Sequence, residues 1–227
     1  MRFSIVIGTY NQIETLPKLV ESLDNQTFKD FEVLFCNDGS TDGTKEYLAE
    51  MKATFPFRVF TQKNKGMRLS KNLNQGIKES LGEYCVFIMG DSFPEMDYLE
   101  TLNDIVDTDR LVCGIRIQVD NGKGVDIDYR FKKGLVPQEQ ALLLKQPWSL
   151  ATGNGLTIPT EAMKKYGMWN EGIEGYGGDD NEIIARLYFK GYTVYSDPNL
   201  RLYHNWHKSK AGENNKKVIE LINSYAR

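Results

Sequence analysis

The sequence predicts an α/β fold in which helices cover both faces of a mostly parallel sheet. Three observations support this prediction. Apolar runs of strand length alternate with helix-periodic segments through the first half of the chain. The predicted strands are almost continuously apolar, as expected for a sheet buried on both faces. Polar residues also cluster directly after several of these strands, where strand–helix loops lie.

The first half of the chain contains four predicted strands with helices between them. The strands are residues 3–7, 31–36, 57–60 and 84–89. Helices are expected near 12–24, near 43–52, along the four-residue repeat of Leu69, Leu73, Ile77 and Leu81, and from about 95. The run Asn37–Gly43 is rich in turn and capping residues and leads into the second of these helices.

The second half of the chain is less regular. Strands are predicted over 110–117, 155–159, 192–196 and 200–204, with helices near 160–166, from 179 to Gly191 and after 217. Residues 120–135 are rich in Gly, Asp and Lys, and we expect a loop there, because such residues offer little apolar surface to offset the entropy of ordering them.

The composition is that of a globular protein and excludes several classes of function. The 227 residues are 41% hydrophobic, and 28 basic against 31 acidic side chains leave a net charge of −3. This balance argues against binding to nucleic acid or to an anionic membrane surface. No apolar run approaches the length of a membrane span, and the three cysteines lie in apolar runs, as expected for reduced core thiols. We therefore expect a cytoplasmic protein.

The common phosphate-binding loops are absent from the sequence. Neither G-x-x-x-x-G-K-[ST] nor G-x-G-x-x-G follows the first strand, which argues against P-loop NTPases and NAD-dependent enzymes. Polar residues instead follow the first, second and fourth strands, namely Thr9, Tyr10, Asn11, Asn37, Asp38, Asp91 and Ser92. Because ligands of such folds bind at the carboxyl ends of the strands, we predict the ligand site at this edge.

In this order the motifs resemble the large inverting family of nucleotide-sugar glycosyltransferases with a GT-A fold, family 2. The resemblance rests on SIVIGTYN (4–11), on NDGSTD (37–42) and on the acidic turn after the fourth strand. The later GYGGDD (175–180) and RLYFKG (186–191) are similar to the G-W-G-G-E-D motif and R-L-x-x-x-G helix of β-1,4-galactosyltransferases and chondroitin-type polymerases. The motifs span residues 4 to about 207 and imply a Rossmann-like GT-A fold and a hexosyltransferase.

The resemblance implies that the first half of the chain binds a UDP-sugar. Asp38 can accept a hydrogen bond from the uracil N3–H, although the run around it would also serve as an Asx turn and helix cap. Lys71 is expected either to meet the pyrophosphate or to lie on a solvated helix face. The expected donor-binding residues are Thr9, Tyr10, Asn11, Glu14, Asp38, Arg68, Lys71, Gly90 and Asp91.

The resemblance also implies a divalent cation, with Mn²⁺ as the first expectation and Mg²⁺ as the second. Where the family has D-x-D, this chain has Met89-Gly90-Asp91, so only the last acid, the metal ligand, is retained. Asp91 could alternatively cap the next helix. The only two histidines, His204 and His207, follow a late strand, and either one is expected to be a second metal ligand. Such a cation neutralises the diphosphate leaving group.

Asp179 and Asp180 begin a predicted helix, whose dipole is expected to keep a carboxylate ionised. By resemblance Asp180 is the general base and Asp179 positions the acceptor; alternatively, both acids only stabilise the start of the helix. The leading expectation is an inverting, metal-dependent transfer of a hexose or N-acetylhexosamine from a UDP-sugar to a saccharide or glycolipid-linked hydroxyl. The alternatives are a nucleotidyltransferase that makes nucleotide sugars, or an inactive nucleotide-sugar-binding protein.

No internal repeat or linker interrupts the sequence, so we expect one glycosyltransferase domain over residues 1–227. Its nucleotide-binding half would span about 1–92, and its acceptor-binding and catalytic half about 93–207. A tail and a helix would follow over 208–227. Polysaccharide or glycoconjugate synthesis is the expected setting, with no nucleic-acid partner and membrane contact only through an acceptor or partner.

Overall fold

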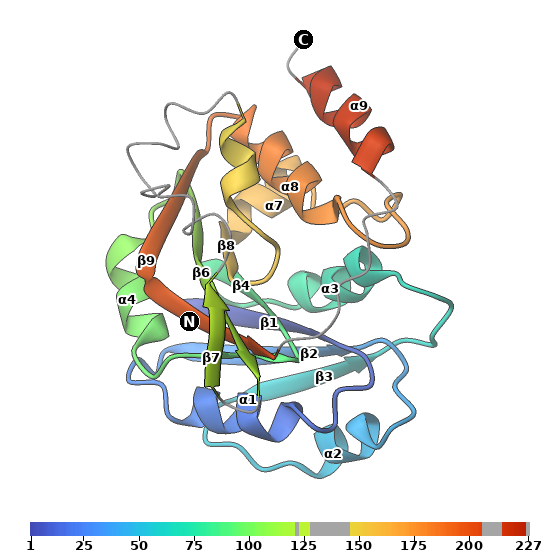
Figure 1. Cartoon of the computed structure of the whole chain (residues 1–227), viewed down its shortest axis with the longest axis vertical. Helices are drawn as coiled ribbons and strands as arrows, with labels where there is room; N and C mark the ends of the chain where they lie inside the picture. Colours follow the sequence, from blue (N-terminus) through green and yellow to red (C-terminus); the bar gives the residue numbers. More distant parts are fainter. Residues whose placement is uncertain (121–122, 128–145, 206–214, 226–227) are drawn as a thin grey trace.

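The computed structural model describes residues 1–120, 123–127, 146–205 and 215–225 (Figure 1). Within these ranges nine strands form one sheet in the order β3-β2-β1-β4-β8-β6-β9-β5, with β7 paired to β6 beside this path. The strands are β1 Phe3–Thr9, β2 Phe31–Asn37, β3 Phe57–Thr61, β4 Tyr84–Met89, β5 Ser92–Pro94, β6 Arg110–Asp120, β7 Lys123–Ile127, β8 Leu156–Pro159 and β9 Thr193–Asn205. A short 3₁₀ helix, η1, covers Pro147–Leu150.

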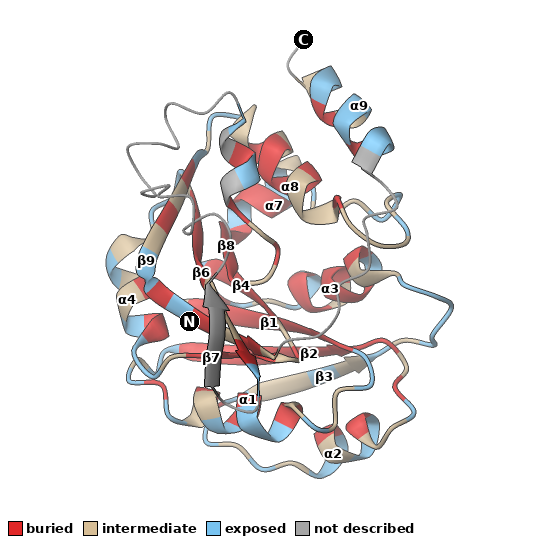
Figure 2. Cartoon of the chain, viewed as in Figure 1, coloured by how far each residue is buried: buried red, intermediate tan, exposed pale blue. Residues whose placement is uncertain are grey.

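Helices cover both faces of the sheet, and each face has its own apolar core. The helices are α1 Leu16–Asp24, α2 Thr44–Glu50, α3 Leu69–Lys78, α4 Tyr98–Ile105, α7 Thr160–Tyr166, α8 Asp179–Tyr188 and α9 Asn215–Tyr225. Residues of α1, α2 and α4 pack into one core, and residues of α3, α7, α8 and α9 pack into the other. Every residue of β1 and β2 is buried between these layers (Figure 2). The predicted α/β class is therefore confirmed.

The first four strands of the chain are parallel, whereas the remainder of the sheet is mixed. β1 pairs in parallel with β2 and β4, and β2 pairs in parallel with β3. β8 then runs antiparallel between β4 and β6, and the short β5 runs antiparallel to the end of β9. The parallel pairs bring the carboxyl ends of β1, β2 and β4 to one edge, where Thr9 lies opposite Asn37 and Gly8 opposite Met89.

Three local expectations are wrong. The α3 helix ends at Lys78, so Leu81 lies beyond it and is 68% exposed. The two strands predicted over 192–196 and 200–204 form one strand, β9. Its pairing with β6 shifts after Gly114, and the resulting bulge contains Pro198, which has no N–H to donate to the neighbouring strand. Part of the expected loop forms β7, which pairs with β6 as an antiparallel partner. Residues 121–122 and 128–135 of that loop lie outside the described ranges.

The three cysteines are buried in the sheet, as expected. Cys36 lies in β2, Cys85 in β4 and Cys113 in β6, and none of the three forms a disulfide. Burial raises the pKa of the Cys36 thiol to about 12. Among the described helices, none is long and apolar enough to cross a membrane.

Candidate active site

The loop after β1 is held in place by the run that follows β2. The Asn11 N–H donates to Ser40 Oγ at 2.9 Å, and Asn11 Oδ1 accepts from the Thr41 N–H at 2.8 Å. Asp42 Oδ2 accepts from the Ile13 N–H at 3.0 Å. Asn11 adopts a φ of +52°, a left-handed conformation that asparagine tolerates better than most residues. The Asn37–Asp42 motif therefore has a local structural role, whatever it binds.

Asp38 directly follows β2 at the carboxyl edge of the sheet and is only 8% exposed. Its backbone N–H donates to Thr9 O at 2.9 Å, and its Oδ1 accepts from Gln62 Nε2 at 2.7 Å. Burial raises the pKa of the Asp38 carboxyl, while the hydrogen bond from Gln62 and the charge of Arg68 act in the opposite direction. Gln62 was not predicted from the sequence, because nothing in its neighbourhood marks it until β3 is placed beside β2.

Six buried side-chain polar atoms surround the same edge and have no hydrogen-bond partner among the described residues. They are Thr9 Oγ1, Gln12 Oε1, Asn37 Nδ2, Arg68 Nε, Ser70 Oγ and Asn72 Oδ1. They come from the ends of β1 and β2, from the loop after β1 and from the start of α3. Buried polar atoms of a folded protein are normally hydrogen-bonded. This edge can therefore offer both donors and acceptors to a polar ligand.

Gly90 forms the turn between β4 and β5, and a side chain there would have to displace the ends of the Gln12 and Thr9 side chains. A Cβ atom there would lie 2.1 Å from Gln12 Oε1 and 2.9 Å from Thr9 Oγ1. The Gly90 N–H donates to Gly8 O at 2.9 Å, and its carbonyl accepts from Thr15 Oγ1 at 2.7 Å. The turn is thus pressed against the loop after β1, and it presents the next residue, Asp91.

Asp91 and His204 meet at this edge from distant parts of the sequence. Asp91 Oδ2 lies 3.4 Å from His204 Nε2, and His204 Nδ1 lies 2.7 Å from Gln118 Oε1. Because an amide oxygen only accepts, Nδ1 carries the proton in this arrangement, and in the neutral ring Nε2 presents its lone pair to the carboxylate. Two acceptors that face each other require a proton or a cation between them.

The pair therefore fits a divalent cation, and the Gln118 contact is the kind that orients a metal-binding imidazole. In the described part of the chain no cluster of three or more His, Cys, Asp and Glu side chains could hold a metal. Mg²⁺-type cations commonly complete their coordination with phosphate oxygens and water. His207 lies outside the described residues.

The Asp179–Asp180 pair begins α8, directly after Gly178, which adopts a φ of +91°. Asp180 Oδ2 accepts from the Gly153 N–H at 3.1 Å, and Oδ1 accepts from the Asn181 N–H at 2.8 Å. Burial, together with the charge of Asp180, raises the pKa of Asp179 to about 6. Burial and the neighbouring charge thus outweigh the helix dipole in their effect on the pKa of Asp179, but a pKa of about 6 still leaves this carboxyl mostly ionised at neutral pH.

Contacts from distant segments hold α8 in place. Buried Glu182 pairs with Arg186 at 2.8 Å and accepts from the Tyr225 hydroxyl of α9 at 2.5 Å. The Arg186 guanidinium also donates to Tyr166 O and Gly167 O, at the carboxyl end of α7. A Cβ on Gly178 would lie 2.7 Å from a methyl group of Val218, so α9 packs directly on the residue before the two acids.

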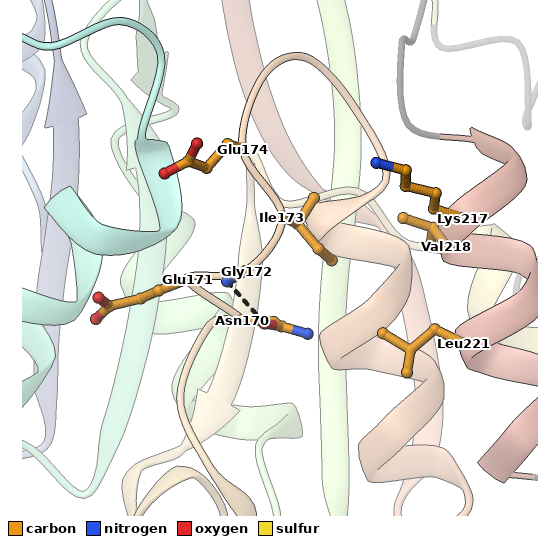
Figure 3. Close-up of a pocket in the computed structure, with 8 residues that line it drawn as sticks. All are labelled: Asn170, Glu171, Gly172, Ile173, Glu174, Lys217, Val218 and Leu221. Carbon is orange, nitrogen blue, oxygen red and sulfur yellow. Dashed lines mark hydrogen bonds between the residues drawn. The ribbon is translucent and has the colours of Figure 1, made fainter.

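A pocket of about 380 Å³ opens between α9 and the loop that precedes the two acids. Its lining residues are Asn170, Glu171, Gly172, Ile173, Glu174, Lys217, Val218 and Leu221. Figure 3 shows Val218 and Leu221 of α9 facing Ile173 across it, while Glu171 points toward α3. Because Val218 also touches Gly178, the pocket lies beside the start of α8.

The remaining predicted residues are less constrained. Arg68 lies at the start of α3, where its backbone and charge act on Asp38. Tyr10, Glu14 and Lys71 are exposed. Among the described residues, the side chains of Glu14 and Lys71 form no hydrogen bond or ion pair with the other candidates. The geometry therefore favours the solvated face as the position of Lys71 in this structure.

Solved structures of glycosyltransferases share this fold. TarS of S. aureus (residues 1–349), solved in complex with UDP, superimposes with a TM-score of 0.79 at 22% identity, over 99% of this chain and 65% of its own. The mannosyltransferase PcManGT from Pyrobaculum calidifontis, in complex with GDP-Man and Mn²⁺, gives a TM-score of 0.66 at 18% identity, over 89% of this chain and 56% of its own. These likenesses confirm the GT-A fold.

The sequence comparisons identify the family. The chondroitin synthase of Escherichia coli is 24% identical over 92% of this chain, which spans only 35% of that protein's length. The profile of "Glycosyl transferase family 2" matches residues 4–165. This match covers β1 through most of α7, including the edge that carries Asp38 and Asp91. The chain therefore belongs to glycosyl transferase family 2 and is a glycosyltransferase.

Proposed function

We propose that this enzyme transfers a hexose or N-acetylhexosamine from a UDP-sugar to a saccharide hydroxyl, with inversion and with the help of a divalent cation. The observation that carries the proposal is the pairing of Asp91 with His204 at 3.4 Å, beside the edge where Asp38 and six unpartnered buried polar atoms gather. A nucleoside diphosphate offers the complementary groups, since it combines polar base and ribose edges with a concentrated negative charge.

The donor base is assigned from the chemistry of Asp38. A carboxylate held by Gln62 and by the start of α3 presents an acceptor to the N3–H of uracil. TarS was solved with UDP and with UDP-GlcNAc, which supports a UDP-sugar. PcManGT was solved with GDP-Man, so a guanosine donor is the alternative that the experiment below distinguishes.

The two carboxylate sites would have different roles. Asp91 and His204 would hold the cation, which when bound neutralises the diphosphate and stabilises its departure. Asp180 would take the proton of the acceptor hydroxyl as that oxygen attacks the anomeric carbon. The bond from this carbon to the diphosphate oxygen breaks in the same displacement, and the oxygen leaves with the electron pair. A single base and a single displacement invert the anomeric configuration.

The acceptor would approach from the side of α8 and α9. The pocket beside Gly178 is lined by apolar Ile173, Val218 and Leu221 together with polar side chains. Such a mixture suits a sugar ring, which has apolar faces and a polar rim. The pocket therefore supports an acceptor longer than one sugar, with its outer units against α9.

A panel of donors with and without metal tests this proposal. UDP-sugars with Mn²⁺ should raise the melting temperature and be slowly hydrolysed, whereas GDP- and CDP-sugars should do neither. Excess EDTA should abolish hydrolysis, and Asp91→Ala should lose the Mn²⁺-dependent binding of UDP. Full hydrolysis in EDTA would overturn the metal dependence. Release of pyrophosphate from UTP and a sugar 1-phosphate would indicate a nucleotidyltransferase instead.

Ser4→Ala provides a matched control for such variants. Ser4 is buried at the amino end of β1, opposite the site, where its hydroxyl donates to Glu32 and accepts from the Gly82 N–H, both at 2.8 Å. Its removal therefore costs two buried hydrogen bonds without reaching the candidate active site. Any loss of UDP or Mn²⁺ binding beyond that of Ser4→Ala is then a property of the site.

A further inference from the structure

The segment Thr152-Gly153-Asn154, which leads into β8, touches both carboxylate sites. β8 lies antiparallel to β4, and the backbone ladder continues to the Gly155 N–H, which donates to Phe87 O at 2.8 Å. At the preceding residue, the side chain of Asn154 takes the place of the next backbone hydrogen bond. Its Oδ1 accepts from the Met89 N–H at 3.1 Å.

The same Asn154 amide spans the turn that presents Asp91. Asn154 Nδ2 donates to Ser92 Oγ at 2.8 Å, and Ser92 Oγ in turn donates to Asp91 Oδ1 at 3.2 Å. The amide thus holds the residues on both sides of Gly90 and Asp91. Met89, which stands where the family has an acid, contributes its backbone N–H to this arrangement.

Gly153 holds the other carboxylate. Its N–H donates to Asp180 Oδ2 at 3.1 Å. A Cβ on Gly153 would lie 2.9 Å from Trp169 Cη2 and 3.2 Å from Asp180 Cβ. Trp169 is 2% exposed and packs edge-on against Phe87, so it cannot easily yield. The backbone of Gly153 therefore packs between the buried indole of Trp169 and Asp180, the candidate base.

We infer that Gly153 and Asn154 are positioning residues that set the separation of the two catalytic carboxylates. Asn154 fixes Asp91 through Ser92, Gly153 fixes Asp180, and the two residues are adjacent in the chain. The Thr152 hydroxyl donates to Asn154 O at 3.1 Å and closes the turn that contains Gly153 and Asn154. A donor sugar whose diphosphate lies at Asp91 would thus present its anomeric carbon at a fixed distance from Asp180. This inference rests on the roles proposed above for Asp91 and Asp180.

The Asn154 side is tested by metal binding without turnover. Titration of Mn²⁺ into the protein saturated with UDP should give a dissociation constant at least about 10-fold weaker for Asn154→Ala, the usual effect of losing a contact behind a metal ligand. Ser92→Ala should show a similar loss. If Asn154 acts through Ser92, the double variant should be no worse than Asn154→Ala. Wild-type Mn²⁺ affinity in either single variant, or additive losses, would overturn this relay.

The Gly153 side is tested by steady-state kinetics. Gly153→Ala must displace Asp180 or Trp169, and kcat should fall about 10- to 100-fold, while the affinities for Mn²⁺ and UDP stay at the level of Ser4→Ala. An unchanged kcat would overturn the positioning role of Gly153. If Asn154→Ala does not fold, Ser92→Ala still tests the relay, because it removes only one hydroxyl.

Two further variants separate this inference from the proposed function. Asp91→Ala and Asp180→Asn are measured in the same assays. If either one transfers sugar at the wild-type rate, the proposed role of that residue is wrong. If both are impaired while Gly153→Ala and Asn154→Ala match Ser4→Ala, only the positioning inference fails.

Discussion

The two sides of the candidate active site are held in place by different kinds of contact. On the donor side, the loop after β1 is braced by the run after β2, which lies about one strand–helix unit further along the chain. On the acceptor side, Asp180 depends on Gly153, and α8 depends on α9 and on the end of α7. The nucleotide-binding loops of the donor side are therefore held by nearby sequence, whereas the acceptor side, like the Asp91–His204 pair, is assembled from distant segments.

The two sides also differ in their electrostatics. The donor edge gathers polar atoms without protein partners, such as Thr9 Oγ1 and Arg68 Nε, and suits a large polar ligand. The start of α8 instead places two carboxyls side by side and raises the pKa of one of them. In the proposed function the donor side binds the nucleotide and the acceptor side exchanges a proton, and the following predictions test that division.

The largest effect is expected on the acceptor side, from Asp180→Asn. The amide keeps the size of the side chain but cannot accept the proton, and positioned bases typically contribute about 10²–10⁴-fold. The transfer rate should fall by that factor while the affinity for UDP hardly changes. Rates from product analysis and affinities from calorimetry check this. If Asp180→Asn transfers normally and Asp179→Asn does not, the roles of the two residues are exchanged.

Asp38→Asn, on the donor side, should have the opposite effect: it should weaken donor binding and leave the rate of transfer unchanged. The new amide turns a donor toward the N3–H of uracil, and losing a hydrogen bond to a charged group should raise the donor KM about 10-fold. The kcat at saturating donor should stay close to that of the wild type. Donor and acceptor titrations separate the two parameters. A fall in kcat with an unchanged donor KM would remove the contrast between the two sides.

Asp179→Asn should change stability in a pH-dependent way. The folded pKa of about 6 lies above the ordinary 3.8, so the folded state holds more protons between these values and the wild type loses stability as pH rises through them. The variant lacks this loss, and its melting temperature at pH 7.5 should exceed that of the wild type by a few degrees. Thermal unfolding at pH 4.5 and 7.5 tests this. A constant difference at both values would refute the assignment.

The same variant should lose less activity than Asp180→Asn. Asp179 is proposed to position the acceptor, so the apparent KM for the acceptor should rise more than kcat falls. Acceptor titrations at fixed donor concentration measure both. A loss of kcat alone would place Asp179 with the proton transfer instead.

Tyr225→Phe should have the smallest effect. It removes the hydroxyl that donates to buried Glu182, which should cost about 1 kcal/mol of stability. UDP affinity should not change, because the contact lies on the acceptor side. Denaturant unfolding and calorimetry provide the two measurements. Weaker UDP binding in this variant would show that the two sides are not separately supported.

The same division explains how much could be predicted from sequence. The strands and helices of the first half follow regular apolar periods, and the β4 boundaries at Tyr84 and Met89 agree with the prediction. Loops that follow parallel strands must meet at one edge, so Thr9, Asp38 and Asp91 could be grouped from the sequence alone. Leu81 misled the prediction because an apolar period does not show where a helix ends.

The second half was less predictable because its contacts depend on pairings that the sequence does not encode locally. Gln118 faces His204 only because β6 and β9 are parallel neighbours with a bulge between Gly114 and Ile115. Asn154 reaches Met89 and Ser92 only because β8 is inserted antiparallel beside β4. Without the sheet order, each is one amide among many.

The buried thiols give a way to observe the two sides separately in solution. A thiol must ionise to react with an alkylating reagent, so Cys36, with a pKa of about 12, stays inert until β2 is exposed to solvent. Cys36 lies in β2, on the donor side of the sheet. Cys113 lies in β6, which β8 separates from the donor-side strands, and therefore reports on the other part of the sheet. If the acceptor side opens without the rest of the sheet, Cys113 should be alkylated in native buffer well before Cys36. Peptide mass mapping of the alkylation rates at Cys36 and Cys113 would then measure how fast each part of the sheet opens.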